Sequence, residues 1–319
     1  MNLLVTGGAG FIGRWVVKRL LEQGNRVWVL DDLSNGRPEN LEDLMKYETF
    51  MGMTQGDIKH LKTLEDLFSS SDFDICYHLA ASINVQDSID DPMATFMNDT
   101  VGTFHLLQLC LKNQVKMVFM STCMVYERAS SEAGITETDP VKPASPYAGS
   151  KIAAENMVLS YYHAYGLPTV VLRPFNTYGP FQKTGGEGGV VAIFIKNKLD
   201  GNPVEIYGDG TQTRDLLYVE DCAHFVVEAG LSDRVNGEIL NAGLGEDITI
   251  NDLAKMIVDD QNQIKHVKHI HPQSEINKLT CNYNRAKSLL NWEPTVSLEE
   301  GIKRTEEWVQ TTDLLGGSS

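Results

Sequence analysis

The chain has 319 residues, a length that suits one large domain carrying a smaller one. Hydrophobic residues make up 42% and charged residues 22% of the chain, which excludes a disordered, collagen-like or membrane-embedded protein. Acidic residues outnumber basic ones by 43 to 27, so the net charge is −16. Nucleic acids and anionic membranes need a basic surface, and we expect neither as a partner.

The cysteines and the N-terminal residues predict a cytoplasmic protein. The five cysteines are widely spaced and form no CxxC pair, which predicts neither a disulfide framework nor a metal site. Met1 leads within two residues into an apolar run without a basic signal segment, and no apolar run approaches the roughly 20 residues of a membrane span. Residues 315–319 have the composition of a flexible tail.

Short apolar runs alternate with stretches of helical length over the first two thirds of the chain. The predicted strands are 3–6, 27–30, 75–79, 115–121 and 169–173. The predicted helices between them are 11–23, 58–70, 92–111 and 145–165. Strands that are apolar throughout are buried on both faces, as in a parallel sheet covered by helices. The pattern predicts a Rossmann-like, doubly wound α/β fold with its ligand crevice at the carboxyl ends of the strands.

The regular alternation ends near residue 178, shortly before a glycine-rich stretch at 185–189. We expect residues 1–178 to form the main domain and residues 179–314 to form a smaller C-terminal α/β domain that binds the substrate. The apolar run at 238–242 predicts a further buried strand, which we expect to return to the main sheet.

Glycines 7, 10 and 13 stand between the first predicted strand and the first predicted helix, in the run TGGAGFIG. They permit a sharp turn, a close approach of a pyrophosphate and tight packing of helix on strand. The helix N-terminus adds free N–H groups and a positive dipole end, so an acidic protein can still bind phosphate here. The spacing of these glycines differs from that of the dinucleotide-binding motif GxGxxG. We predict a dinucleotide site because the loop lies directly between a strand and a helix.

Asp31 and Asp32 end the second predicted strand, about 20 residues beyond this loop. A carboxylate at that place accepts hydrogen bonds from the adenosine ribose and repels a 2′-phosphate, which favours NAD over NADP. The nearby Arg37 leaves NADP open. Asp57, which follows the next predicted element, is a candidate neighbour of the adenine amine.

Tyr147 and Lys151 are four residues apart at the start of a predicted helix and therefore share one helix face. A free tyrosine has a pKa near 10. An adjacent ammonium group and the positive nicotinamide of an oxidised cofactor favour the phenolate, which can then act as a base. Thr122 ends a predicted strand at the crevice edge, where its hydroxyl can share the substrate oxygen with Tyr147.

Six motifs, in this order, resemble the extended short-chain dehydrogenase/reductase family, specifically its nucleotide-sugar epimerases and dehydratases. They are TGGAGFIG (6–13), HLAA (78–81), STxxVY (121–126), YxxxK (147–151), LRPFNTYGP (172–180) and GDGTQTRDLLYVED (208–221). The resemblance covers almost the whole chain. It implies an NAD-dependent enzyme that acts on a UDP-sugar, and a homodimer.

The resemblance implies that Thr122, Tyr147 and Lys151 are the catalytic residues. The cofactor contacts expected from the motifs are Gly7, Gly10, Phe11, Ile12, Gly13, Asp31, Asp32, Ser34, Asn35, Gly36, Asp57, Ile58, Leu79, Ala80, Ala81, Asn98, Tyr147, Lys151 and Pro174. The expected substrate contacts are Val85, Met124, Asn176, Gly189, Val190, Phe194, Ile206, Tyr207, Arg214, His271 and Glu275. Arg214 is expected to pair with the pyrophosphate, whereas His271 departs from the arginine usual at its place.

The family implies a common first step, in which Tyr147 takes the proton of the sugar 4-hydroxyl as C4 is oxidised to a ketone. Return of the hydride to the other face gives a 4-epimer, and loss of water between C5 and C6 gives a dehydrated sugar. The common 4,6-dehydratases carry Asp-Glu after the catalytic threonine, but this chain has Cys123 and Met124 there, and methionine cannot move a proton. Thr-Cys resembles the UDP-N-acetylglucosamine 4-oxidase/5,6-dehydratases of the tunicamycin and pseudaminic-acid pathways.

We therefore expect 4-oxidation of UDP-N-acetylglucosamine followed by 5,6-dehydration to a 5,6-ene. Cys123 is the candidate acid, and Glu127, where the family normally has glycine, is the candidate base at C5. The alternative is a 4-epimerase of a UDP-hexose or UDP-N-acetylhexosamine, in which Cys123 packs and Glu127 lies on the surface. A non-catalytic NAD-binding sensor is a third hypothesis, which the intact catalytic set disfavours.

Overall fold

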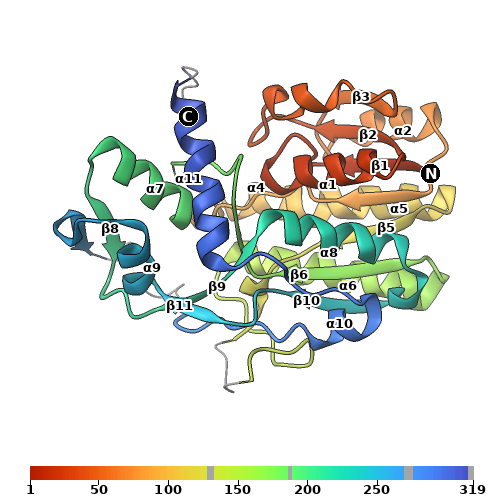
Figure 1. Cartoon of the computed structure of the whole chain (residues 1–319). Coiled ribbons are helices and arrows are strands. Elements are labelled where there is room, and N and C mark those ends of the chain that lie inside the picture. The colour runs from red at the N-terminus through yellow and green to blue at the C-terminus, as the bar shows by residue number, and fades with distance from the viewer. Residues whose placement is uncertain (128–132, 186–188, 269–275, 315–319) are drawn as a thin grey trace.

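A seven-stranded parallel sheet forms the main body of the protein, in the order β10-β6-β5-β4-β1-β2-β3. The computed structural model describes residues 1–127, 133–185, 189–268 and 276–314 (Figure 1). The strands of the sheet are β1 (Asn2–Thr6), β2 (Arg26–Asp31), β3 (Phe50–Gln55), β4 (Ile75–His78), β5 (Lys116–Met120), β6 (Thr169–Pro174) and β10 (Glu238–Ala242). The predicted doubly wound α/β fold is confirmed.

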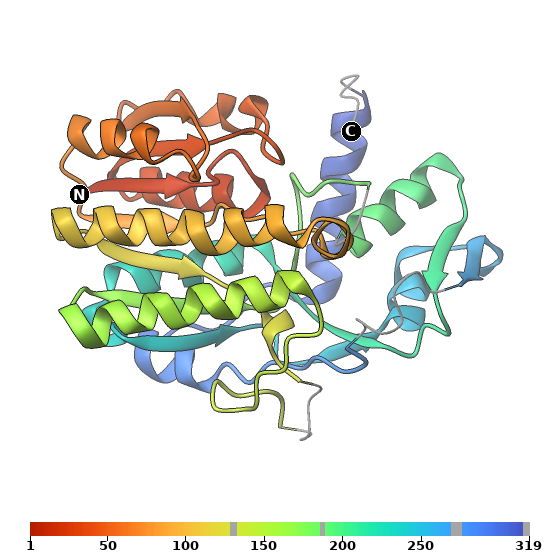
Figure 2. The same ribbon diagram turned by 180° about the vertical axis from the view of Figure 1, so that it is seen from behind.

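Helices cover both faces of this sheet because its strands are apolar on both sides. In β1, Leu3 and Val5 belong to one buried cluster and Leu4 belongs to the other. The first face is covered by α1 (Phe11–Glu22), η1 (Pro38–Leu44), α8 (Val219–Leu231) and α10 (Asn284–Leu290). The second face is covered by α2 (Leu61–Ser70), α5 (Thr103–Asn113) and α6 (Pro146–Tyr165), of which α5 (yellow) and α6 (light green) lie side by side in Figure 2.

Two elements of the main body differ from the sequence prediction. The edge strand β3 was not predicted, because its residues are mostly half-exposed and form no buried apolar run. The single helix predicted over 92–111 is divided into α4 (Pro92–Phe96), the π-helical turn η2 (Met97–Gly102) and α5. The short helix α3 (Val85–Asp90) precedes them.

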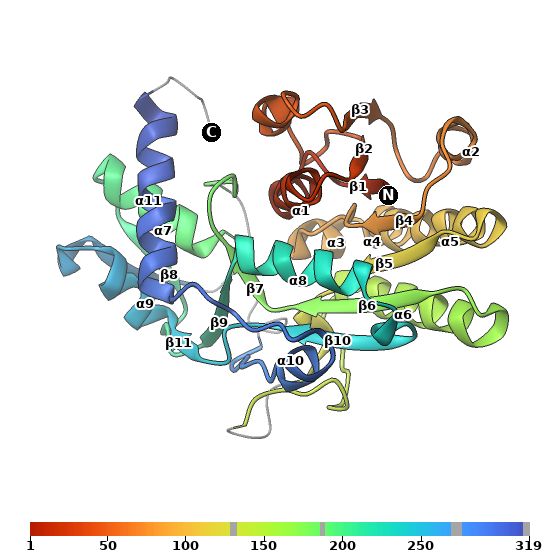
Figure 3. The ribbon, with the colours of Figure 1, turned by 45° about the vertical axis from the view of Figure 1, so that its right-hand side comes forward.

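A smaller lobe has its own apolar core beside the carboxyl ends of the main strands (Figure 3). Its strands form a three-stranded sheet of β7 (Asn176–Tyr178), β9 (Thr213–Tyr218) and β11 (Asp247–Thr249), and a two-stranded sheet of β8 (Val204–Tyr207) and β12 (Ile264–Val267). Its helices are α7 (Val190–Asp200), α9 (Ile250–Ile257) and α11 (Leu298–Leu314). Short 3₁₀ turns are η3 (Cys123–Val125), η4 (Asp233–Val235) and η5 (Gln261–Gln263).

The chain after residue 178 contributes to both lobes. Helix α8 packs on α1, and β10 pairs in parallel with β6 in the register Glu238 to Val170. The strand expected at 238–242 therefore lies in the main sheet. No helix in the described part of the chain combines the length and the apolar character that crossing a membrane requires.

Candidate active site

The glycine loop after β1 is a cradle built from backbone. Gly7 has a φ of +72°, and a Cβ on Gly13 would lie 2.0 Å from the carbonyl oxygen of Gly7, so no side chain fits there. Helix α1 begins at Phe11, and its N-cap, Gly10, offers no side-chain acceptor to the first N–H groups of the helix. These N–H groups fit a pyrophosphate.

Asp31 ties the end of β2 to this loop. Its Oδ2 accepts a hydrogen bond from the N–H of Ala9 at 2.9 Å, and its Oδ1 accepts one from the N–H of Leu33 at 2.9 Å. Burial raises the pKa of Asp31 above its usual value, and the two N–H donors oppose this shift. The contact with the loop was not predicted from the sequence, which addressed only the ribose.

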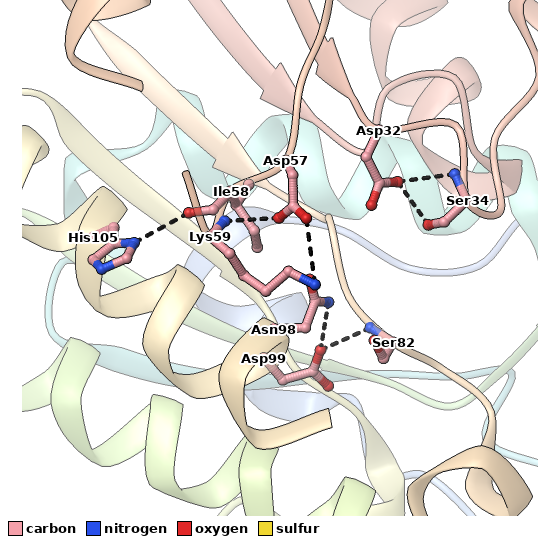
Figure 4. Close-up of polar contacts among 9 residues, drawn as sticks. All are labelled: Asp32, Ser34, Asp57, Ile58, Lys59, Ser82, Asn98, Asp99 and His105. Carbon is pink, nitrogen blue, oxygen red and sulfur yellow. Dashed lines mark hydrogen bonds and ion pairs between the residues drawn. The ribbon is translucent and has the colours of Figure 1, made fainter. Parts of the chain in front are cut away.

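The next predicted cofactor residues are collected at the same edge of the sheet (Figure 4). Asp32 accepts two hydrogen bonds from Ser34, at 2.9 Å from its N–H and 2.6 Å from its hydroxyl. Asp57 accepts the N–H of Lys59 at 2.7 Å and forms an ion pair with the same lysine at 3.3 Å. Asn98 lies on η2 and points toward this group of acids.

Two further predicted cofactor residues lie at the carboxyl ends of strands in the main sheet. Ala80 follows β4 and donates its N–H to Thr6 Oγ1 at 3.3 Å, next to the glycine loop. Pro174 ends β6, where it pairs with Ala242 of β10. The other predicted cofactor residues are Ile12 on α1, Asn35 and Gly36 after β2, Ile58 after β3, and Leu79 and Ala81 after β4. Predicted cofactor residues thus follow or end five strands of the sheet, β1, β2, β3, β4 and β6, at its carboxyl edge.

The predicted catalytic residues lie together. Ser145 caps α6 through its Oγ, which accepts the N–H of Ala148 at 3.2 Å. Tyr147 and Lys151 face inward from this helix and are 7% and 2% exposed. The Tyr147 hydroxyl is hydrogen-bonded to Thr122, which follows β5. The Lys151 ammonium lies 4.6 Å from the centre of the Phe119 ring.

Burial dominates the electrostatics of this set. It raises the pKa of Tyr147, the nearby Asp99 raises it further, and the bond to Thr122 lowers it. It also lowers the pKa of Lys151, against the opposing charges of Asp99 and Glu155. The sequence predicted the ammonium and the positive nicotinamide beside the tyrosine but not these carboxylates. The phenolate of Tyr147 therefore needs more positive charge than Lys151 provides.

Cys123 is a buried thiol next to the catalytic set. It is 2% exposed and belongs to an apolar cluster with Phe175 and Cys281. Burial raises its pKa to about 12, opposed by the charge of Arg214. At neutral pH the thiol therefore keeps its proton. Met124, the next residue, is half-buried at the edge of the same cluster.

The sequence-based prediction that Glu127 is a base at C5 is not supported. Its carboxylate is 48% exposed and forms an ion pair with Lys142 at 2.8 Å. The physical reason lies in Tyr126, which points into the core and donates its hydroxyl proton to Asn241 Oδ1 at 2.8 Å. The backbone is extended at this point, so the next side chain points outward.

The predicted substrate residues divide into three groups. Phe194 of α7 and Ile206 of β8 pack in the core of the smaller lobe, so a contact with substrate is not supported for them. The remaining described members are Val85, Met124, Asn176, Gly189, Val190, Tyr207 and Arg214. His271 and Glu275 lie outside the described residues.

Two of the remaining members fit a polar ligand. Oδ1 of Asn176 is buried and accepts no hydrogen bond within the described part of the chain, so it is available to a bound donor. Arg214 is half-buried on β9 and is oriented by two carbonyl acceptors, those of Thr213 at 2.7 Å and Ile276 at 3.0 Å. Its guanidinium carries the positive charge that suits an anion.

Sequence reasoning missed the charged groups beneath the catalytic residues. Glu155 accepts hydrogen bonds from Arg173, with Nε to Oε1 at 2.9 Å and Nη2 to Oε2 at 2.5 Å, and also from Ser121. The four-residue spacing from Lys151 to Glu155 was the available signal for this neighbour. Asp99 has no comparable signal, since only the fold brings it to Lys151.

The comparisons with known proteins agree with this geometry. A family model described as GDP-mannose 4,6 dehydratase matches residues 4–305. The X-ray structure of Pal from Bacillus thuringiensis is 66% identical, with a TM-score of 0.96, and the match covers 98% of this chain and 99% of that chain.

Two UDP-glucose 4-epimerase structures are also similar. The Thermotoga maritima enzyme with UDP-glucose is 36% identical, with a TM-score of 0.91 and coverage of 98% and 99%. The Thermus thermophilus enzyme in complex with NAD is 33% identical, with a TM-score of 0.89 and coverage of 97% and 99%.

Proposed function

The chain belongs to the GDP-mannose 4,6-dehydratase family of NAD-dependent nucleotide-sugar epimerases and dehydratases, and from this premise we propose that it oxidises C4 of a UDP-sugar. The observation that carries the proposal is the buried set of Tyr147, Thr122 and Lys151 at the carboxyl ends of the parallel strands. A tyrosine held by a hydroxyl and an ammonium is suited to moving one proton at a sugar hydroxyl.

NAD is the cofactor of this reaction, and when bound it supplies hydride transfer at its nicotinamide. The glycine cradle before α1 fits its pyrophosphate, and the acids at the ends of β2 and β3 fit its adenosine half. In the protein alone, Tyr147 lacks the positive charge that would stabilise its phenolate. The oxidised nicotinamide carries such a charge. Tyr147 then takes the proton of the 4-hydroxyl, and Thr122 holds the same oxygen.

The nucleoside diphosphate is expected in the smaller lobe. Arg214 would pair with the diphosphate, and the free Oδ1 of Asn176 would accept a hydrogen bond from the bound substrate. UDP is the favoured nucleotide, because the Thermotoga maritima enzyme was solved with UDP-glucose.

For the fate of the 4-ketone we favour 5,6-elimination from UDP-N-acetylglucosamine. A 4-ketone acidifies the C5–H, and departure of the 6-hydroxyl as water needs a proton donor. Return of the hydride to C4 then restores the 4-hydroxyl and the oxidised cofactor and leaves the 5,6-ene. The Cys123 thiol is buried beside Tyr147 and stays protonated at neutral pH, as such a donor must. The base at C5 is not assigned, since Glu127 is held at the surface by Lys142.

The second candidate is a 4-epimerase, and the position of Glu127 favours it. With that carboxylate at the surface and methionine at position 124, the described residues around Tyr147 supply one acid and no dedicated base for elimination. Epimerisation needs only the catalytic set and space for the ketone to turn.

Incubation of the protein and NAD with UDP-N-acetylglucosamine, followed by mass spectrometry and proton NMR, tests the proposal. Loss of one water with new vinyl signals supports 5,6-elimination. A product of unchanged mass with an inverted C4 proton supports the epimerase. Unchanged UDP-N-acetylglucosamine, together with unchanged UDP-glucose in a parallel incubation, contradicts the proposed function.

We also infer that the protein is a homodimer through the surface of α4, η2 and α5. Four large apolar side chains there are 39–67% exposed, namely Met93, Phe96, Met97 and Phe104. Such side chains on neighbouring helices favour burial against a second copy. Sedimentation should give a dimer for the natural chain and a monomer for Phe104→Glu; a monomeric natural chain would contradict the inference.

A further inference from the structure

A buried carboxylate that the proposed reaction does not use lies on the element that packs against the helix of Lys151. Asp99 belongs to the π-helical turn η2, which packs against α6, and it is 1% exposed. π-Helical turns within helices occur frequently at functional sites. A hydrogen bond joins η2 to α6 one residue before Lys151, since Thr100 Oγ1 donates to the carbonyl oxygen of Ser150 at 3.0 Å.

The two oxygens of Asp99 differ in their surroundings. Oδ1 accepts the N–H of Ser82 at 2.7 Å and the side-chain amide of Asn98 at 3.0 Å, as Figure 4 shows. Oδ2 is buried and accepts no hydrogen bond within the described part of the chain. Burial raises the pKa of Asp99, whereas the positive charge of Lys151 and the two hydrogen bonds to Oδ1 lower it. A carboxylate buried in this way is costly unless a positive charge lies nearby.

The other charged groups around Lys151 are already accounted for. Glu155, four residues along α6, is paired with Arg173. His78, at the end of β4, bonds to Thr hydroxyls through both ring nitrogens, and its pKa is lowered to about 3 by burial and by Lys151, so it is neutral. Tyr147 is protonated, because burial raises its pKa. Of the two carboxylates whose charges act on Lys151 among the described residues, Asp99 is therefore the one without a cationic partner of its own.

We infer that Asp99 is the buried counter-ion of Lys151 and a positioning residue for the C4 oxidation. Through Lys151, Asp99 restricts the action of Tyr147 as a base to the state in which the cofactor is oxidised. The inference rests on the proposed function. The negative charge of Asp99 keeps Lys151 an ammonium despite its burial, and it offsets that ammonium at Tyr147. The further positive charge then comes from the oxidised nicotinamide, and in its absence Tyr147 keeps its proton.

The test is Asp99→Asn, which removes the charge and leaves an oxygen that can accept both bonds of Oδ1. Loss of a negative charge lowers the pKa of Tyr147 and of Lys151 together. The acidic and the alkaline limb of the plot of kcat/KM against pH should therefore both move to lower pH by about one unit. Asp99→Glu should keep the natural profile, as should Asp90→Asn, a charge removal on the exposed end of α3. An equal loss of rate at every pH, with no shift of either limb, would overturn the inference.

A second readout does not depend on turnover. The phenolate absorbance of the NAD-loaded protein is titrated with pH, and the titration of the matching Tyr147→Phe variant is subtracted to isolate Tyr147. Tyr147 should ionise at lower pH in Asp99→Asn than in the natural chain, and an unchanged ionisation overturns the inference. If Asp99→Asn does not fold, Asp99→Ser takes its place with the same expectation. A shifted titration in a protein that converts no UDP-sugar would refute the proposed function alone.

Discussion

At the scale of single residues, the chemistry depends on a tyrosine that burial makes a poor base. Tyr147 has a raised pKa and lies among groups whose charges nearly balance, namely Lys151 with Asp99 and Arg173 with Glu155. A protein that left this phenolate permanently formed would bind the positive nicotinamide tightly but would have no proton to return to the sugar. The raised pKa therefore suits a group that takes a proton in one half-reaction and gives it back in the other.

Tyr147→Phe removes the hydroxyl and leaves the ring in its buried place. We expect kcat to fall by about 10²–10⁴-fold, the usual loss for a general acid/base, with little change in NAD affinity. Steady-state kinetics and fluorescence titration of NAD measure the two quantities. Activity near that of the natural chain would remove Tyr147 from this role.

Cys123→Ala separates the two fates of the ketone. If the thiol is the acid of elimination, the variant should produce no dehydrated sugar, while oxidation at C4 should continue. Mass spectrometry of the products and exchange of label at C4 follow the two steps. Cys222→Ala, another buried thiol on the far side of the sheet in α8, is the matched control. Dehydration at the natural rate in Cys123→Ala would exclude the thiol as the acid.

At the scale of elements, the cofactor site is formed by strand ends that the sequence reveals well. The strands β1, β2, β4, β5 and β6 were predictable because they are apolar throughout, and the glycine loop was predictable because Gly13 leaves no space for a side chain. Edge strand β3 was not predicted because it has no buried apolar run. The π-helical turn was not predicted because helical periodicity over twenty residues does not reveal one inserted residue.

Tertiary contacts decide where the structure places the predicted site residues that do not join the catalytic set. Glu127 points outward because Tyr126 is bonded to Asn241, 115 residues away. Phe194 and Ile206 point into the smaller lobe because their own helix and strand form its core. No local pattern contains this information, whereas the spacing of Tyr147 and Lys151 on one helix does determine that they lie together.

Asp31→Ala tests the element formed by the glycine loop and the end of β2. The change removes the acceptor of two backbone N–H groups and the proposed ribose contact. We expect NAD to bind at least about ten-fold more weakly, the cost of a hydrogen bond to a charged group, and NADP to lose less. Calorimetric titration of both cofactors measures this, with Glu39→Ala on the exposed start of η1 as control. Equal weakening of NAD and NADP would argue against the ribose contact.

At the scale of the whole molecule, one buried carboxyl group makes the stability of this acidic chain depend on pH. Asp215 of β9 is buried and accepts the N–H groups of Leu244, Gly245 and Cys281, and burial raises its pKa to about 7. The folded state thus binds a proton that the unfolded state has released above pH ~4. This contribution to stability is complete below pH ~4 and is lost as the pH rises to about 7.

The free energy of unfolding should accordingly be greater at pH 5.5 than at pH 7.5, by roughly 1–2 kcal/mol from this group. Thermal unfolding of the protein without added ligand at the two pH values measures the difference. Asp215→Asn should reduce it, because the amide does not titrate. Greater stability at pH 7.5 would contradict the buried state assigned to this carboxyl.

The central claim is that the two lobes hold NAD and a UDP-sugar so that C4 of the sugar is oxidised beside Tyr147. The most direct measurement uses UDP-N-acetylglucosamine carrying deuterium at C4 with the NAD-loaded protein, stopped by acid before one turnover is complete and followed by mass spectrometry of the reduced cofactor. We expect deuterium on the reduced nicotinamide at this stage and a slower reaction than with the unlabelled sugar, and loss of both in Tyr147→Phe. Product formed at an equal rate from both sugars, with no label on the cofactor, would contradict it.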